Sequence, residues 1–217
     1  MKQKLFIQAA TLASIIAVCI APSAQAAVPF TDVKTSHTHY VAIHDLYGKG
    51  VITGVSSTLY KPGQPATRGE AALFLANALG LNTTTVKNPG FQDVPTSSPY
   101  YQAIAVLYEQ EIIGGYGDTF RPNHTLTRSQ IAKMLTLGFG LEQSTVTATK
   151  FVDVNRLTDL QARRYIQTLV DYQITNGTSA TAFSPNNQLT RGQLATFLYN
   201  SMKADDDSIV FEVVGVE

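Results

Sequence analysis

The chain has 217 residues, of which 44% are apolar and 15% charged, and its formal net charge at pH 7 is zero. This composition is typical of a globular protein. The chain has no excess of basic residues and no basic run interleaved with aromatic residues, which argues against binding to nucleic acid or to anionic lipid. Any anion that the protein binds must therefore be held by local groups.

Residues 1–26 are predicted to form a signal peptide. Lys2 and Lys4 precede a mostly apolar stretch over 5–21, and Ala-Gln-Ala at 24–26 is a small-x-small cleavage site. A membrane anchor fits less well, because the apolar stretch is short, is interrupted by polar and small residues, and stops at a cleavage site. We therefore expect the mature chain to be exported and not to be a membrane protein.

Cleavage after residue 26 removes the only cysteine, Cys19, with two of the 16 basic residues and none of the 16 acidic ones, which leaves a net charge of −2. Val18 is not one of the small residues that usually precede a lipid-modified cysteine, which argues against a lipid anchor. The mature chain is then expected to lack disulfides and thiolate metal ligands, so its stability must come from packing.

Four short motifs recur in the same order three times. The first is Phe-x-Asp-Val at 30–33, 91–94 and 151–154. The others are a motif that begins with Val or Ile and ends in glycine at 51–54, 112–115 and 174–177, an aromatic-x-Pro triplet at 60–62, 120–122 and 183–185, and Thr-Arg-x-Glu/Gln at 67–70, 127–130 and 190–193. This order divides the mature chain into repeats at 27–88, 89–149 and 150–203.

Each repeat is predicted to fold as helix, loop, helix. Apolar residues at helical spacing over 40–47 and 101–108 predict the first helix, and the pattern is set two residues later in the third repeat, at Ile166, Leu169 and Val170. The glycine of the second motif is expected to end this helix and to take a positive φ. The proline of the aromatic-x-Pro triplet then favours an extended segment.

The second helix of each repeat has a strong start signal. Thr67, Thr127 and Thr190 each stand three residues before Glu or Gln, which is the pattern of a capping box, and an apolar face follows. A unit of about 60 residues with two short amphipathic helices buries little surface. We therefore expect a mostly α-helical fold in which three stacked repeats share one core.

Residues 204–217 leave the repeat pattern. The three aspartates at 205–207 predict a solvated hinge, and the apolar run at 209–214 predicts a short β-like strand. This tail either packs on the repeats or belongs to a further segment.

Together the motifs resemble those of the S-layer homology family, and the resemblance covers residues 30 to about 203. It implies a pseudo-threefold assembly, a secreted location at the cell wall or S-layer, and grooves between repeats that bind secondary cell-wall polysaccharide, often one that carries a pyruvate ketal. In such grooves the motif arginine and its neighbours hold the acidic sugar. The resemblance thus implies non-covalent anchoring to the wall, without a cofactor.

The chain also departs from the family pattern. The tryptophan early in the first helix is absent, and the glutamate of the last motif is kept only as Glu70, with glutamine in the other two repeats. The glycine that opens the middle motif is kept only as Gly50, with Glu111 and Gln173 in the other copies. We therefore expect three grooves that are not equivalent.

The motif arginines Arg68, Arg128 and Arg191 are the main candidates for ligand binding. Each begins a helix, where the positive end of the helix dipole disfavours a cation. An arginine beside exposed helix amides instead suits a carboxylate, through paired charge-assisted hydrogen bonds. The alternative is a structural ion pair, for instance with the aspartate of a neighbouring repeat.

The other candidates are more ambiguous. Asp32, Asp93 and Asp153 either cap backbone amides or bind sugar hydroxyls. The glycan-binding set predicted with them consists of the middle-motif glycines and two tyrosines, Gly54, Gly115, Gly177, Tyr40 and Tyr101. These tyrosines and Tyr116 either stack on a sugar ring or pack at the core and its rim.

Metal binding and catalysis have little support. His37, His39 and His44 cluster in one repeat only and lack cysteine or carboxylate at ligand spacing, so we expect exposed polar residues and no metal site. No Gly-x-Ser-x-Gly, His-Glu-x-x-His or phosphate-binding loop is present. We expect a non-catalytic module; the alternatives are an accessory to a wall-remodelling enzyme and a surface module that binds another protein.

Overall fold

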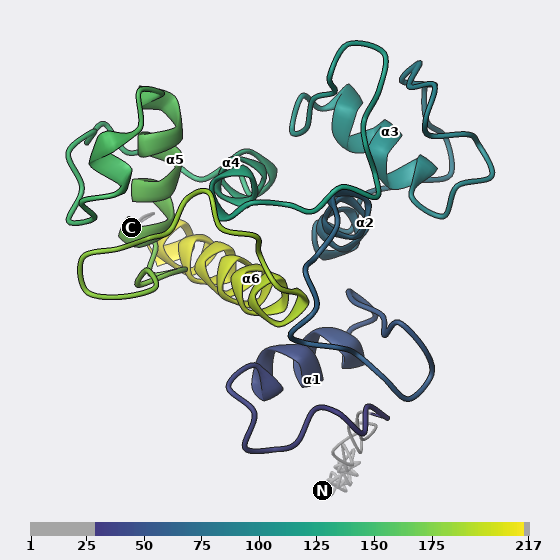
Figure 1. Ribbon diagram of the computed structural model, residues 1–217, viewed down its shortest axis with the longest axis horizontal. Helices are drawn as coiled ribbons and strands as arrows, with labels where there is room; N and C mark the ends of the chain where they lie inside the picture. Colours follow the sequence, from purple (N-terminus) through teal and green to yellow (C-terminus); the bar gives the residue numbers. More distant parts are fainter. Residues whose placement is uncertain (1–28, 215–217) are drawn as a thin grey trace, which may run out of the picture.

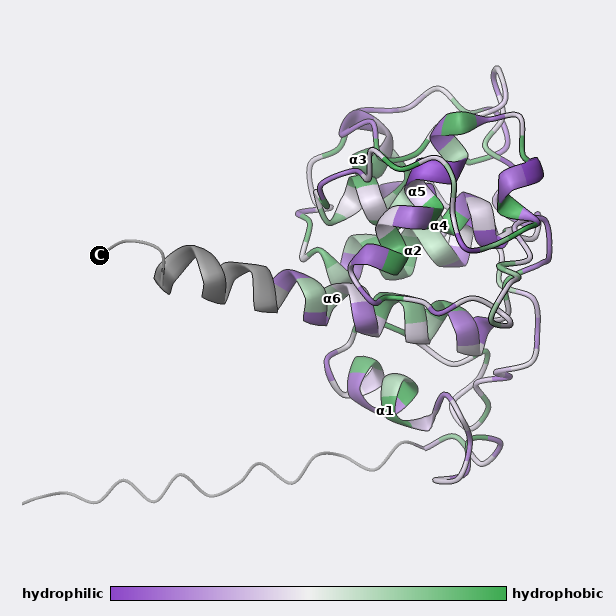
Figure 2. Ribbon diagram, turned by 90° about the vertical axis from the view of Figure 1, so that its left-hand side faces the viewer, coloured by the Kyte–Doolittle hydropathy of each residue, from purple (hydrophilic) through white to green (hydrophobic). Residues whose placement is uncertain are grey.

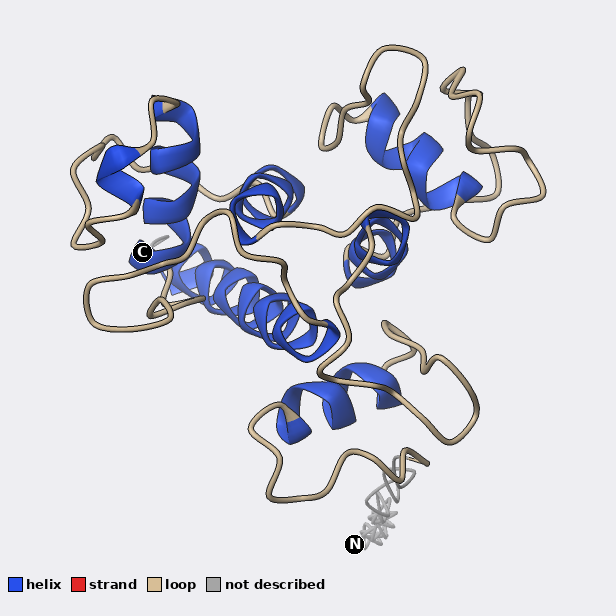
Figure 3. Cartoon of the chain, in the orientation of Figure 1, coloured by secondary structure: helices blue, strands red, loops and turns tan. Residues whose placement is uncertain are grey.

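The computed structural model describes residues 29–214, with side chains through residue 205, so the predicted signal peptide lies outside the described residues. Over this range the chain forms six α-helices and one short 3-10 helix joined by long loops, without a β-strand (Figure 3). The prediction of a mostly α-helical fold is confirmed. Every helix in this part of the chain is too short or too polar to cross a membrane.

Each repeat contributes two helices. The first helices are α1 (Tyr40–Gly48), α3 (Tyr101–Glu109) and α5 (Leu160–Asp171), the last preceded by the 3-10 helix η1 (Val154–Arg156). The second helices are α2 (Arg68–Ala78), α4 (Arg128–Gly138) and α6 (Arg191–Val214). In Figure 2 these helices carry both hydrophobic and hydrophilic segments, as expected when one side of a helix faces a core.

The second helices begin where the capping boxes predict. In α2 the Thr67 hydroxyl accepts a hydrogen bond from the Glu70 amide, and the Glu70 carboxylate accepts one from the Thr67 amide at 2.9 Å. The same reciprocal pair joins Thr127 to Gln130 and Thr190 to Gln193. A glutamine therefore closes the box as well as a glutamate does.

The helices pair across the repeat boundaries. Figure 1 shows α2, α4 and α6 around the centre of a pseudo-threefold arrangement, with α1, α3 and α5 at its periphery. The first helix of each repeat packs against the second helix of the preceding repeat: α3 lies against α2 and α5 against α4, and the ring closes where α1 lies against α6. Each lobe of the molecule thus combines parts of two repeats.

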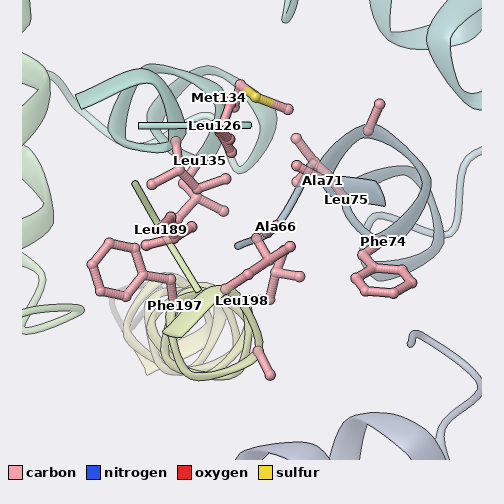
Figure 4. Packing of buried hydrophobic residues seen from close by; sticks show 14 of the residues in the cluster. Ala66, Ala71, Phe74, Leu75, Leu126, Met134, Leu135, Leu189, Phe197 and Leu198 are labelled. Atoms are coloured by element: carbon pink, nitrogen blue, oxygen red, sulfur yellow. The ribbon is translucent and has the colours of Figure 1, made fainter. Parts of the chain in front are cut away.

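The three repeats meet at the centre through a cyclic set of backbone hydrogen bonds. The Ala66 amide donates to the Leu189 carbonyl at 2.8 Å, the Leu126 amide to the Ala66 carbonyl at 3.0 Å, and the Leu189 amide to the Leu126 carbonyl at 2.8 Å. All three residues are fully buried, within a cluster that includes a leucine from each second helix, Leu75, Leu135 and Leu198 (Figure 4). The predicted shared core is therefore confirmed.

The short strand predicted for 209–214 is wrong, because α6 continues to Val214. Between Gly192 and Gly215 the chain has neither glycine nor proline, so no residue there breaks the helix at the hinge predicted for 205–207. Aspartate is a weak helix former, but the acidic run does not end the helix.

The role predicted for the middle-motif glycines is also partly wrong. The left-handed residues that follow the first helices are Gly50, Glu111 and Gln173, with φ of 70°, 59° and 55°, and only Gly177 among the middle-motif glycines has a positive φ. These glycines are required instead by close approach. A Cβ on Gly54, Gly115 or Gly177 would lie 2.5, 2.2 or 2.5 Å from the ring of the phenylalanine that begins the same repeat, Phe30, Phe91 or Phe151.

Candidate functional site

Each motif arginine is the first residue of a second helix and reaches into the next repeat of the ring. Its Nε donates to the carbonyl of the aromatic-x-Pro residue there: Arg68 to Phe120 at 2.9 Å, Arg128 to Phe183 at 2.7 Å and Arg191 to Tyr60 at 2.8 Å. Each guanidinium also lies over that residue's ring, at 4.4, 4.5 and 4.5 Å from the centroid. With 8%, 3% and 1% of their surface exposed, the three arginines are fixed at the junctions between repeats.

The helix amides beside these arginines are not exposed, contrary to the prediction. The amides of Arg68 and Gly69 donate to the carbonyls of His124 and Pro122 in the next repeat, at 2.9 and 2.8 Å. Equivalent pairs of bonds form at the starts of α4 and α6. A ligand carboxylate at these sites cannot bind to the amides that begin the helices, because these amides are already bonded.

The three motif aspartates bind backbone amides of the aromatic-x-Pro triplets. Both carboxylate oxygens of Asp93 accept hydrogen bonds, from the amides of Phe120 at 2.8 Å and Arg121 at 2.7 Å. Asp32 and Asp153 hold the equivalent amides of their own repeats. The structural alternative is thus observed for all three, and a sugar contact by the aspartates stays a prediction.

These bonds explain an unexpected backbone conformation. The residue before each proline was predicted to be extended, yet Lys61, Arg121 and Ser184 are left-handed, with φ of 56°, 62° and 59°. The aspartate opposite offsets the cost of this conformation by accepting two amide bonds. Burial opposes the ionisation of Asp153, but its hydrogen bonds from backbone amides outweigh burial and lower its pKa.

The three arginines differ at Nη2. Arg68 donates from this atom to the Gly114 carbonyl at 3.0 Å, and Arg191 donates to the Thr53 carbonyl at 2.8 Å. Arg128 makes no equivalent bond, and its buried Nη2 has no hydrogen-bond partner among the described residues. One donor at this junction is therefore left unsatisfied by the protein.

Arg191 is also the one motif arginine that forms an ion pair with another described residue. Its Nη1 contacts the carboxylate of Glu70, the glutamate that closes the capping box of α2. The structural ion pair expected as an alternative is confirmed for Arg191, although its partner is Glu70 and not a motif aspartate. All three of its guanidinium nitrogens are occupied within the protein.

A first cavity, which we call the Arg68 groove, has a volume of about 220 Å³. It lies between the middle motif of the second repeat and α4, and its polar lining comes from Arg68, Gly115, Tyr116, Gln130 and Lys133. The Gln130 side chain donates to the Tyr116 hydroxyl at 3.1 Å, and the guanidinium groups of Arg68 and Arg121 lie 5.0 and 4.5 Å from the centroid of the tyrosine ring. The groove thus presents two cations, Arg68 and Lys133, and no acidic residue lines it.

A second cavity, the Arg128 groove, is larger, at about 580 Å³. Besides Arg128 and Gly177 it is lined mainly by neutral hydroxyl, amide and imidazole groups, contributed by Thr38, His39, Gln173, Thr175, Asn176, Thr178, Gln193, Thr196 and Asn200. Burial lowers the pKa of Arg128, and likewise that of Arg68, but a guanidinium remains charged at neutral pH. This groove combines one cation with many hydrogen-bonding groups.

The structure brings together only part of the predicted glycan-binding set. Gly115 and Gly177 line the two grooves, and Gly54 lies beside Thr53, the partner of Arg191. Tyr40 and Tyr101 are half-buried against the core and line neither groove.

Several groove residues were missed by sequence reasoning. Gln193, Thr196 and Asn200 line the Arg128 groove at spacings of three and four residues along α6, and this polar stripe beside the apolar residues of the helix was the available signal. His39 was predicted to be exposed, but it lies against the same helix, with its Nδ1 2.8 Å from the Thr196 hydroxyl. Its burial, together with nearby His37, lowers its pKa. No three His, Cys, Asp or Glu side chains in the described range are grouped so as to bind a metal ion.

Comparison with known proteins gives the same assignment as the motifs. The family model described as the S-layer homology domain matches at residues 29–72, 90–132 and 150–195. An S-layer protein of Bacillus thuringiensis subsp. finitimus is 31% identical over 88% of this chain, which covers 23% of that protein. A cellulosome-anchoring protein of Acetivibrio thermocellus is 30% identical over 81% of the chain and 41% of its own length.

An enzyme is also among the relatives: the exoglucanase XynX of Acetivibrio thermocellus is 26% identical over 83% of this chain, which spans 17% of the enzyme. The chain therefore spans less than half the length of each of these relatives. With three consecutive matches that follow the three structural repeats, the chain belongs to the S-layer homology domain family, and it is a secreted, cell-wall-associated or S-layer protein.

Proposed function

We propose that the chain anchors non-covalently to the bacterial cell wall by binding an acidic, pyruvylated secondary wall polysaccharide in the Arg68 and Arg128 grooves. The observation that carries the proposal is Arg128, which lines the 580 Å³ groove and whose buried Nη2 has no hydrogen-bond partner among the described residues. An unsatisfied buried donor costs about 1–3 kcal/mol. A ligand carboxylate that reaches this guanidinium would remove that cost, and no acidic lining residue opposes its entry.

The remaining lining of both grooves suits a sugar. The amides and hydroxyls of the Arg128 groove, such as Asn176, Thr178 and Gln193, offer both donors and acceptors to sugar hydroxyl groups. In the Arg68 groove the Tyr116 hydroxyl and the Gln130 side chain can exchange hydrogen bonds with sugar hydroxyls. The cation in each groove then selects the acidic residue of the polysaccharide.

The Arg191 junction is proposed to be structural. Its guanidinium is neutralised by Glu70 and bonded to two backbone carbonyls, so a second carboxylate would meet a paired cation beside an anion. We therefore expect two working grooves in a ring of three.

We further propose that the chain itself is not an enzyme. Glycoside hydrolysis generally requires two carboxyl groups on opposite sides of the scissile bond. Neither groove is lined by one, and because Glu109 and Glu111 both line the cavity beside the Arg68 groove, the groove itself has no carboxyl group to place on the other side of the bond. Because the match spans 17% of the exoglucanase, that relative's activity need not reside in the shared part.

The test is titration calorimetry of the mature chain with purified wall polysaccharide, before and after mild acid removal of its ketal substituent. Arg128→Lys and Arg68→Lys keep the charge but lose the planar fork, and each is expected to weaken binding at its groove by about 1–3 kcal/mol. Arg191→Lys is the matched control: it is expected to lower the melting temperature while leaving affinity unchanged in the folded molecules.

Equal affinity for wild type and all three variants would place the anchoring chemistry elsewhere. Unchanged binding after ketal removal would contradict selection of the acidic sugar. If the chain still binds walls from which the polysaccharide has been stripped, the alternative of a protein-binding surface module replaces the proposal. Release of reducing sugars from wall material by the purified chain would overturn the non-catalytic role.

A further inference from the structure

We propose that the Arg68 groove continues into a second subsite that holds the next, uncharged sugar residue of the same polysaccharide chain. The inference rests on the proposed function and extends it from one sugar to two. The second subsite, which we call the Lys87 subsite, is a cavity of about 420 Å³ between the linker that precedes the second repeat, the end of α3 and the start of the middle motif.

The two cavities are neighbours. Ile113, Gly114 and Lys133 line both of them, so a ligand in the Arg68 groove lies next to the Lys87 subsite. The Arg68 groove alone, at 220 Å³, is smaller than the roughly 300–1,000 Å³ of most ligand pockets. With the adjoining cavity the site reaches the size that an oligosaccharide needs.

The charges of the Lys87 subsite are not used within the protein. Lys87 and Lys133 line it together with Glu109 and Glu111, and none of these four side chains forms an ion pair with another described residue. Two cations and two anions sum to no net charge, so the subsite favours an uncharged ligand. Carboxylates accept hydrogen bonds from sugar hydroxyls and ammonium groups donate to them, which suits a pyranose with free hydroxyls.

An aromatic ring completes the subsite. Tyr108 lines the cavity, and its ring packs edge-on against Phe91, with 5.0 Å between the ring centroids. It is nevertheless 42% exposed, so part of the ring remains open to a ligand. An apolar ring beside hydroxyl-binding charges is the combination that a pyranose requires, since its ring carbons are apolar and its edge is polar.

Glu111 permits a clean test, because its backbone is left-handed, with φ of 59°. The equivalent residue of the first repeat is Gly50, with φ of 70°. Glu111→Gly therefore removes the side chain and leaves a residue that adopts this conformation without strain. Combined with Lys87→Ala it leaves the net charge unchanged, so long-range electrostatic attraction is the same in variant and wild type.

The experiment is an amide NMR titration of the mature chain with fragments from partial hydrolysis of purified wall polysaccharide: the acidic monosaccharide and a longer fragment that contains it. The Gly115 amide reports on the Arg68 groove, that of Asn88 on the Lys87 subsite and that of Gly177 on the Arg128 groove. In the wild type we expect both fragments to shift Gly115, and only the longer one to shift Asn88 and to bind more tightly. In the Lys87→Ala/Glu111→Gly variant the longer fragment is expected to lose about tenfold in affinity at Gly115, with the monosaccharide unchanged.

The Gly177 amide is the internal control, because neither substituted residue lines the Arg128 groove. Equal affinity of both fragments at Gly115 in the wild type, or an unchanged ratio in the double variant, would overturn the subsite. Shifts at Gly177 without shifts at Gly115 would also overturn it, because the Arg68 groove would then be unused. If no fragment shifts any of these amides, the proposed function itself fails.

Discussion

At the scale of single residues, an exchange of acid for amide distinguishes the three junctions. The third residue after the capping threonine is Glu70 at the junction that contains Arg191, and its carboxylate pairs with that guanidinium. At the other two junctions the same position is a glutamine, Gln130 or Gln193, which closes its capping box without supplying a charge. The guanidinium opposite a glutamine keeps its charge for a ligand, whereas the one opposite glutamate does not.

Gly115 is required by the close approach of Phe91, so Gly115→Ala is expected to lower the free energy of unfolding by about 1–3 kcal/mol. A Cβ at this position would lie 2.2 Å from the phenylalanine ring. Neighbouring Gly114 is the matched control, because a Cβ there meets no atom within 4 Å and its φ is not positive. Urea unfolding should show Gly114→Ala within about 0.5 kcal/mol of wild type. Equal stability of the two variants would mean that the ring moves aside readily.

His39 makes stability depend on pH, with a sign that follows from its burial. Burial and then His37 lower its pKa below 6.5, so between the folded and unfolded values the unfolded chain binds more protons. Its contribution to stability is therefore complete above about pH 6.5 and is lost as the pH falls towards the folded pKa. His39→Gln is expected to flatten this part of the profile of melting temperature against pH, and His124→Gln, at an exposed histidine, is expected to leave it unchanged. A profile as steep in His39→Gln as in wild type would assign the effect to other groups.

At the scale of helices, the local signals in the sequence were sufficient for starts but not for ends or partners. Capping boxes place the first residue of α2, α4 and α6, because the bonds that form them span three residues. The end of α6 was predicted wrongly, because the β-branched residues at 209–214 suggested a strand. The helix continues through them, since no glycine or proline stands between Gly192 and Gly215 to break it. The packing of α1 against α6 depends on closure of the whole ring, which no local pattern encodes.

The candidate site was likewise predicted only in part from the sequence. The motif arginines were identifiable because each has a fixed place in a repeated motif. The free Nη2 of Arg128 and the ion pair of Arg191 were not, since they depend on which residue of another repeat lies opposite. The polar stripe on α6 can be identified as part of a binding site only from the structure, which places it in one groove with the middle motif of the third repeat.

The capping box of α4 is expected to contribute measurably to stability. Thr127→Ala removes the hydroxyl that accepts a hydrogen bond from the Gln130 amide. Urea unfolding is expected to show that the free energy of unfolding falls by about 1 kcal/mol. Thr125→Ala is the control, because this threonine is exposed two residues away and its side chain caps no helix. A loss as large in the control would show that the loop, and not the cap, carries the effect.

At the scale of the whole molecule, the fold is a closed ring in which every junction joins two repeats. The first helix of each repeat packs on the second helix of its predecessor, and each motif arginine donates to the repeat that follows. Removing one repeat would leave an arginine and two helix amides without partners at one junction and would expose the face of an outer helix at the other. The physical unit of folding is therefore the ring of three, although the unit of sequence is the single repeat.

The three axial amides test this cooperativity directly. Ala66, Leu126 and Leu189 come from different repeats, are fully buried and bond to one another, so we expect their hydrogen exchange to require opening of the whole ring and to report the same free energy. Leu198→Ala, at a fully buried site of the third repeat, should lower that free energy by about 2–5 kcal/mol at all three amides equally. Since the Ala66 amide donates to the Leu189 carbonyl, loss of the third repeat's structure releases Ala66 whether or not the repeats open together. The Leu126 amide decides, because it donates to the Ala66 carbonyl, outside the third repeat. If the repeats opened independently, the exchange of Leu189 and Ala66 would accelerate in the variant while that of Leu126 kept its wild-type rate, whereas opening of the whole ring accelerates all three equally.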